Sequence, residues 1–88
     1  MTKEKIYEIL SELNKGMRVP EDYLGFEPGP FRGAIKQLQE QGYLSGIKFA
    51  TGGRTPYPQM MWIEKGYVTV KGFQYIEDYL KNEVNITQ

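Results

Sequence analysis

The chain has 88 residues, with 11 basic and 11 acidic side chains and a hydrophobic content of 40%. This length and composition fit one globular domain with one modest core. The sequence contains no cysteine and no histidine, which excludes a disulfide framework, a thiol nucleophile, a Cys/His zinc site and a histidine general base.

The N-terminal segment predicts a cytoplasmic protein. Charged residues in MTKEKIYEIL stand where a signal peptide needs an apolar run. No stretch approaches the ~20 apolar residues that a membrane span requires. We therefore expect no association with a membrane.

The first predicted element is a helix that begins at Lys3, with Thr2 as its N-cap. Its apolar residues recur at helical spacing and form one stripe: Ile6, Ile9, Leu10 and Leu13. Gly16 stands where a glycine ends a helix. Pro20 then suits the first position of a second helix, which must be brief because Gly25 follows.

A third helix is predicted to start at Pro28-Gly29-Pro30 and to end at Gly42. Its inward residues are predicted to be Phe31, Ile35 and Leu38. A hairpin follows, with strands at residues 45–50 and about 59–64 joined by a glycine-containing loop. The second strand is apolar on both faces, so its periodicity does not decide which face is buried.

Thr69 is predicted to cap a last helix that runs from Val70 to about Asn82. We expect Phe73, Ile76 and Leu80 to face inward on it. One domain would then span residues 1–84, and residues 85–88 would form a short C-terminal tail.

This order of elements predicts an α+β fold of the winged helix-turn-helix type, with three helices, a two-stranded hairpin wing and a C-terminal helix. The motifs Leu38-x-x-x-Gly42-Tyr43-Leu44 and Val68-Thr69-x-Lys71-Gly72-x-x-Tyr75-Ile76 resemble those of winged-helix regulators. Over roughly residues 3–80 the chain resembles the YjcQ-type small winged-helix proteins of Gram-positive bacteria and their phages. The resemblance implies this fold and a DNA-binding ancestry, without an assigned activity.

The candidate DNA-binding residues lie in the only net-positive part of the chain. Residues 28–63 contain four basic side chains against Glu40 alone, a balance of +3, which would steer an anionic partner there. Early residues of a recognition helix meet base edges and a wing contacts phosphates. The predicted contacts are Arg32, Gly33, Lys36 and Gln37 on the third helix, and Lys48 and Arg54 on the hairpin. A solvated amphipathic helix and a plain hairpin loop explain the same residues.

A second candidate site is apolar. Tyr57, Met60, Met61 and Trp62 cluster on and before the second strand, and any that stay exposed would suit a protein partner. The last helix has a wide apolar side, so a homodimer through this helix or the wing is expected. Core packing is the alternative for both groups.

The sequence does not predict an enzyme or a cofactor. The adjacent carboxylates of Glu21-Asp22 and Glu77-Asp78 point in different directions on a helix. The leading hypothesis is a small bacterial or prophage transcription regulator that binds duplex DNA through phosphates. The alternative is a winged-helix scaffold for protein–protein contact without DNA binding, which the zero net charge favours.

Overall fold

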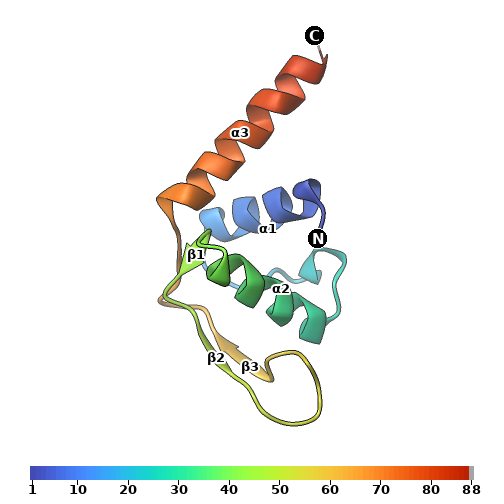
Figure 1. The fold of residues 1–88 in the computed structure, drawn as a ribbon, viewed down its shortest axis with the longest axis vertical. Helices are drawn as coiled ribbons and strands as arrows, with labels where there is room; N and C mark the ends of the chain where they lie inside the picture. The colour runs from blue at the N-terminus through green and yellow to red at the C-terminus, as the bar shows by residue number, and fades with distance from the viewer. Residues whose placement is uncertain (88) are drawn as a thin grey trace.

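The computed structural model describes residues 1–82 in full and the helical backbone of residues 83–87. This part of the chain forms an α+β domain with three α-helices and two antiparallel strand pairs (Figure 1). The elements in chain order are α1 (Lys3–Lys15), the 3-10 turn η1 (Tyr23–Gly25), α2 (Pro28–Glu40), β1 (Leu44–Ser45), β2 (Lys48–Ala50), β3 (Met60–Trp62), β4 (Tyr67–Val68) and α3 (Val70–Thr87).

The first helix, α1, has the boundaries that its caps predict. The Oγ1 atom of Thr2 accepts a hydrogen bond of 3.1 Å from the amide of Lys5, which satisfies one of the free N–H groups of the first turn. The amide of Gly16 donates to the carbonyl of Leu13 at the other end. Ile9, Leu10 and Leu13 are buried on one face.

The prediction of a second helix after Pro20 is wrong, because the segment forms only the 3-10 turn η1. Tyr23 and Leu24 have φ angles of 51° and 50°, and Gly25 has a φ of 84°. These three residues lie in the left-handed region, which a right-handed α-helix excludes. The side chain of Asp22 accepts a hydrogen bond from the amide of Leu24 and stabilises the turn.

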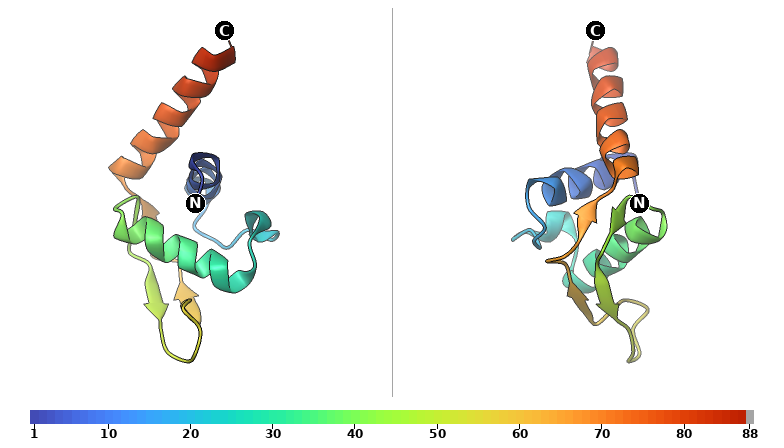
Figure 2. Two further views of the ribbon diagram at one scale, coloured as in Figure 1. Left: turned by 45° about the vertical axis from the view of Figure 1, so that its right-hand side comes forward. Right: turned by 90° about the vertical axis from the view of Figure 1, so that its left-hand side faces the viewer.

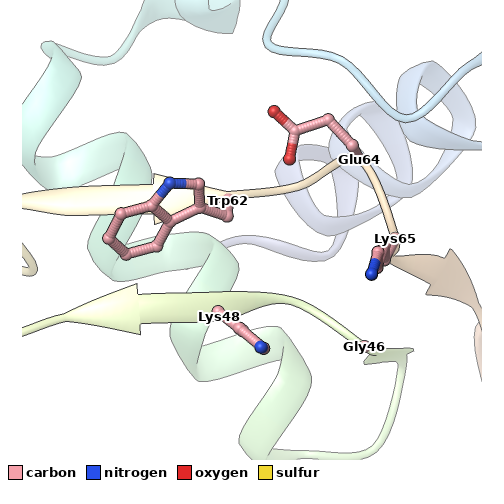
Figure 3. A pocket seen from close by; sticks show the side chains of 5 residues that line it. All are labelled: Gly46, Lys48, Trp62, Glu64 and Lys65. Atoms are coloured by element: carbon pink, nitrogen blue, oxygen red, sulfur yellow. The ribbon is translucent and has the colours of Figure 1, made fainter.

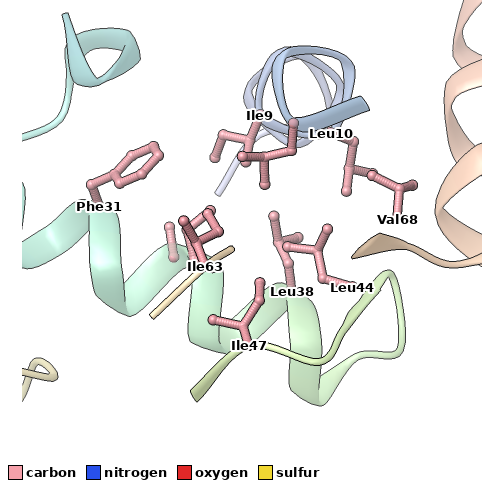
Figure 4. Close-up of a cluster of buried hydrophobic side chains, with 11 residues drawn as sticks. Ile9, Leu10, Phe31, Leu38, Leu44, Ile47, Ile63 and Val68 are labelled. Atoms are coloured by element: carbon pink, nitrogen blue, oxygen red, sulfur yellow. The ribbon is translucent and has the colours of Figure 1, made fainter. Parts of the chain in front are cut away.

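The third predicted helix is α2, and its apolar face is confirmed. Pro28 and Pro30 occupy its first turn, where the missing N–H groups cost nothing. Phe31, Ile35 and Leu38 are fully buried. They form one core with apolar residues of α1 and the strands (Figure 4): Ile9, Leu10, Leu13, Phe31, Ala34, Ile35, Leu38, Leu44, Ile47, Ile63 and Val68.

The predicted hairpin is present but interrupted. Strands β1 and β4 pair next to the helices, and β2 and β3 pair beyond them, with Lys48 opposite Trp62. The interruption falls at Gly46, which has a φ of 80° and whose Cβ would lie 2.6 Å from the carbonyl oxygen of Lys65. Glycine is therefore needed there, both for the dihedral angle and for the close approach of the backbones.

The structure resolves which face of the 59–64 strand is buried. Ile63 is buried and Met61 packs against the core. Met60 and Trp62 point outward and keep 54% and 43% of their surface exposed. The helices cover the inner face alone, so only alternate residues of this apolar run find partners.

The last helix, α3, leaves the body of the domain (Figures 1 and 2). The described chain measures 49 × 23 × 22 Å because of this projection. One face of α3 packs on α1, where the rings of Tyr7 and Tyr79 stack with centroids 4.3 Å apart. Tyr75 donates a hydrogen bond to the carbonyl of Lys3, and burial, with the neighbouring Tyr43, raises the pKa of Tyr75.

Two expectations for α3 differ from the structure. The sequence predicts that Phe73 and Leu80 face inward, but they are 45% and 46% exposed, because the helix extends past α1 and only one of its faces meets another element. The helix also continues to Thr87 rather than ending near Asn82. It therefore includes most of the predicted tail, whose last residue, Gln88, lies outside the described residues. None of the helices described is both long and apolar enough to span a bilayer.

Candidate functional site

The outer surface of α2 near its N-terminus is covered by the loop that joins β2 to β3, residues 51–59, hereafter the hairpin loop. The Nε atom of Arg32 donates a hydrogen bond of 2.8 Å to the carbonyl of Pro58. Pro58 itself is buried. The guanidinium therefore holds the hairpin loop, whereas the sequence predicts that Arg32 contacts DNA.

Two glycines of α2 provide the second contact with the hairpin loop. Gly29 and Gly33 lie one turn apart under the ring of Tyr57. A Cβ on Gly33 would come within 2.8 Å of the Tyr57 Cδ1 atom, and a Cβ on Gly29 within 3.4 Å of its Cδ2 atom. Because neither glycine has a side chain, the tyrosine ring can lie close against the backbone of α2. Gly33 thus allows the close approach of the protein's own loop, at a position that the sequence predicts to contact DNA.

The two remaining DNA-binding candidates of α2, Lys36 and Gln37, form no hydrogen bond or ion pair with the hairpin loop among the described residues. Lys36 Nζ lies 3.9 Å from the carboxylate of Glu40, one turn along the helix, and this contact is too exposed to hold it firmly. Gln37 is exposed. The predicted recognition surface is therefore divided: Arg32 and Gly33 contact the hairpin loop, and Lys36 and Gln37 face solvent.

A side chain that the sequence analysis did not single out fixes the hairpin to α2. Gln39 Nε2 donates to the carbonyl of Ile47, and the amide of Ile47 donates to Gln39 Oε1, both at 2.9 Å. This paired contact satisfies backbone groups at the interruption of the strands. No local sequence pattern predicts this contact, because Gln39 and Ile47 come together only when the hairpin packs against α2.

The face of the hairpin that points away from the helices carries an exposed site. A shallow pocket of about 410 Å³ lies there, and Figure 3 shows Trp62 and Lys48 side by side on adjacent strands within it. We call this site the outer hairpin surface; it comprises Gly46, Lys48, Met60, Trp62, Glu64 and Lys65. Met60 belongs to it because it shares the outward face of β3 with Trp62.

The four apolar residues predicted as one interaction cluster are separated by the fold. Met60 and Trp62 belong to the outer hairpin surface, while Met61 packs against the core. Tyr57 covers the glycines of α2 and keeps 39% of its surface exposed. Half of the predicted cluster is therefore available on one continuous face.

The basic residues of the hairpin are exposed. Among the ion pairs of the described residues, none includes Lys48, Arg54 or Lys65. Glu64 is the acidic residue of the outer hairpin surface, and Figure 3 shows its carboxylate extending away from Lys48 and Lys65. The surface thus combines exposed apolar side chains with an excess of positive charge.

A second exposed apolar feature lies on α3. Val70, Phe73 and Leu80 are 83%, 45% and 46% exposed. With Glu77 they recur at intervals of three and four residues, which places them along one side of the helix. Glu77 interrupts this stripe with a charge.

We compared the chain with family models, curated proteins and solved structures, and none of them matches it.

Proposed function

We propose that this chain is a small protein-interaction domain on a winged-helix scaffold, which binds a protein partner through the outer hairpin surface. The observation that carries the proposal is the exposure of Met60 and Trp62 on one face, beside a pocket. The surface that a winged-helix protein would present to base edges is, by contrast, engaged by Tyr57 and Pro58 of the same chain.

The chemistry of the exposed residues supports a protein partner. Tryptophan and methionine are enriched at protein–protein interfaces, and tryptophan is among the residues that contribute most to binding when buried. Single exposed apolar residues are common on any surface, but here two of them adjoin on one strand next to a hollow. The zero net charge agrees with this reading, because dedicated DNA-binding domains are usually basic.

Site-specific photocrosslinking in cells that naturally produce the chain tests the proposal. Met60 is replaced by a photoreactive benzoylphenylalanine, and the adducts are digested separately with protease and with nuclease. We expect a discrete protein adduct. The matched control is the same replacement of Asn14, an exposed residue of α1 away from the hairpin, which should give no such adduct. Equal adducts from both positions, or adducts of nucleic acid alone, would contradict the proposal.

The second candidate is the regulator that the sequence suggested: a cytoplasmic protein of bacterial or prophage origin that binds duplex DNA, as a homodimer. The observation that favours it is the exposure of Lys48, Arg54 and Lys65 on the hairpin without an ion pair among the described residues. These side chains suit phosphate contacts. Base contacts by Arg32 and Gly33 would first require the hairpin loop to leave α2.

Fluorescence anisotropy with random-sequence duplex at low salt separates the two candidates. A DNA-binding protein would bind, and its affinity would fall by about 0.9 log units per decade of salt for each phosphate neutralised. The protein-interaction proposal expects no binding at tens of micromolar protein. Steep, salt-dependent binding that Lys48→Ala with Arg54→Ala weakens would favour the regulator.

A further inference from the structure

We infer that the pocket beside Trp62 receives an acidic segment of the partner protein, with an apolar side chain on the indole and carboxylates near Lys48 and Lys65. This inference rests on the proposed function and adds the chemistry of the partner. Three features of the outer hairpin surface carry it: the cross-strand position of Lys48, the exposed apolar face of β3, and the excess of unpaired cations.

The strand register places the cation and the indole together. Lys48 lies directly opposite Trp62 in the β2–β3 pair, and side chains at opposed positions share a face with Cβ atoms roughly 5 Å apart. Gly46, which lies between β1 and β2, allows the backbone there to approach the carbonyl of Lys65. That approach brings the second lysine to the same pocket, which both lysines line.

The apolar part of the site needs a side chain from outside. Trp62 and Met60 alternate with residues of the inner face, and they keep 43% and 54% of their surface exposed. Met60 and Trp62 share the outward face of β3, and a pocket of about 410 Å³ lies beside Trp62. A leucine or phenylalanine side chain seated there would remove this surface from water.

The charges select an acidic partner over a basic one. Lys48 and Lys65 line the pocket, Arg54 is exposed in the hairpin loop, and Glu64 is the acidic residue beside them. Covering the indole would partly dehydrate the two ammonium groups, which then require counter-charges. Carboxylates on either side of the seated apolar residue supply them, whereas a basic segment would be repelled.

The protein offers its own reporter for this test, because Trp62 is the only tryptophan in the sequence. Its emission is followed while a short peptide with a central leucine between runs of glutamate is added. We expect a saturable change. Affinity should be at least about ten-fold weaker for the peptide with lysine in place of glutamate, and for the one with glycine in place of leucine. Equal affinity of the three peptides would overturn the inference.

Charge-reversal variants test the two lysines while retaining the reporter. Lys48→Glu with Lys65→Glu should abolish binding of the acidic peptide, and Lys48→Gln with Lys65→Gln should weaken it at least about ten-fold. Both lysines are exposed, so far-ultraviolet circular dichroism should show an unchanged fold. The matched control is Lys3→Glu, an exposed lysine on α1, which should bind as the wild type does. Wild-type affinity in the lysine variants would overturn the inference.

The failure of the inference is distinguishable from the failure of the proposed function. If the acidic peptide leaves the emission of Trp62 unchanged while the photoreactive residue at position 60 still gives a protein adduct, the partner is not acidic and the proposed interaction function stands. Tighter binding of single-stranded oligothymidylate than of the peptide would reject the acidic segment in favour of base stacking on the indole. If the photoreactive residue at position 60 gives adducts of nucleic acid and none of protein, both the inference and the proposed function are rejected.

Discussion

The Nε atom of Arg32 donates a hydrogen bond to the carbonyl of Pro58 across 26 positions of sequence. The helix that was predicted to contact DNA thus uses its single arginine to hold the protein's own hairpin loop. The ring of Tyr57 on Gly29 and Gly33 completes this contact. The hairpin loop and the N-terminal half of α2 therefore form one structural unit, which can be tested by stability measurements.

Replacing Arg32 by alanine should destabilise the domain. Hydrogen bonds to charged groups contribute about 1.5–3 kcal/mol, and neutral ones about 1 kcal/mol. Since Arg32 is only partly buried, we expect a loss of about 1 kcal/mol in the free energy of unfolding, measured with urea. Gln37→Ala on the same helix is the control and should stay within about 0.5 kcal/mol of wild type. Equal effects of the two substitutions would mean that the loop contact adds nothing.

Gly33→Ala should behave differently with and without Tyr57. Alanine is favoured over glycine inside a helix by about 1 kcal/mol, but here the new Cβ would lie 2.8 Å from Tyr57 Cδ1. We expect little gain, or a loss, in the wild type, and a gain of about 1 kcal/mol in the Tyr57→Ala background. A double-mutant cycle measures the difference. Identical effects in both backgrounds would show that the ring does not rest on Gly33.

Gln39→Glu should make stability depend on pH. The ionised carboxyl can still accept from the amide of Ile47, but it loses the donor to the Ile47 carbonyl. Its protonated form keeps a donor, so the folded state should raise the pKa of the introduced carboxyl. Stability is then fully present below the ordinary glutamate value of about 4.3 and is lost as pH rises through the raised folded value.

Urea unfolding at about pH 4 and about pH 8 measures this effect, with Gln37→Glu as the exposed control on the same helix. The variant should lose stability relative to the control on going to the higher pH. A constant difference between the two proteins across this range would show that the amide pair with Ile47 does not persist in solution.

Glu77→Leu should promote self-association through α3. The substitution completes an exposed apolar stripe with Val70, Phe73 and Leu80, and it removes a charge that would be dehydrated in a helix pair. Sedimentation equilibrium should show a larger dimer fraction than for wild type at the same concentration. Glu77→Gln removes the charge without adding apolar surface and should increase the dimer fraction less. An unchanged mass for the leucine variant would exclude this stripe as a contact.

The helices and the core follow from local patterns. Phe31, Ile35 and Leu38 repeat at helical spacing and are buried as predicted, because a helix has one period and its apolar stripe has to face the core. Caps act over three or four residues, so Thr2 and Gly16 mark the ends of α1 correctly. The prediction of a brief helix after Pro20 was wrong because residues of this segment adopt left-handed dihedral angles. Tyrosine and leucine rarely adopt such angles, so the residue types of Tyr23 and Leu24 do not predict them.

The sequence by itself determined where the three α-helices begin and which stripe of α2 is buried, since these depend on neighbours a few positions apart. Only the tertiary structure decided which surfaces remain open. Trp62 faces outward, Arg32 is engaged by Pro58, and Phe73 is exposed because of how distant segments pack. The surface that remains available to a partner is what that packing leaves uncovered, so it depends on contacts between segments far apart in the sequence.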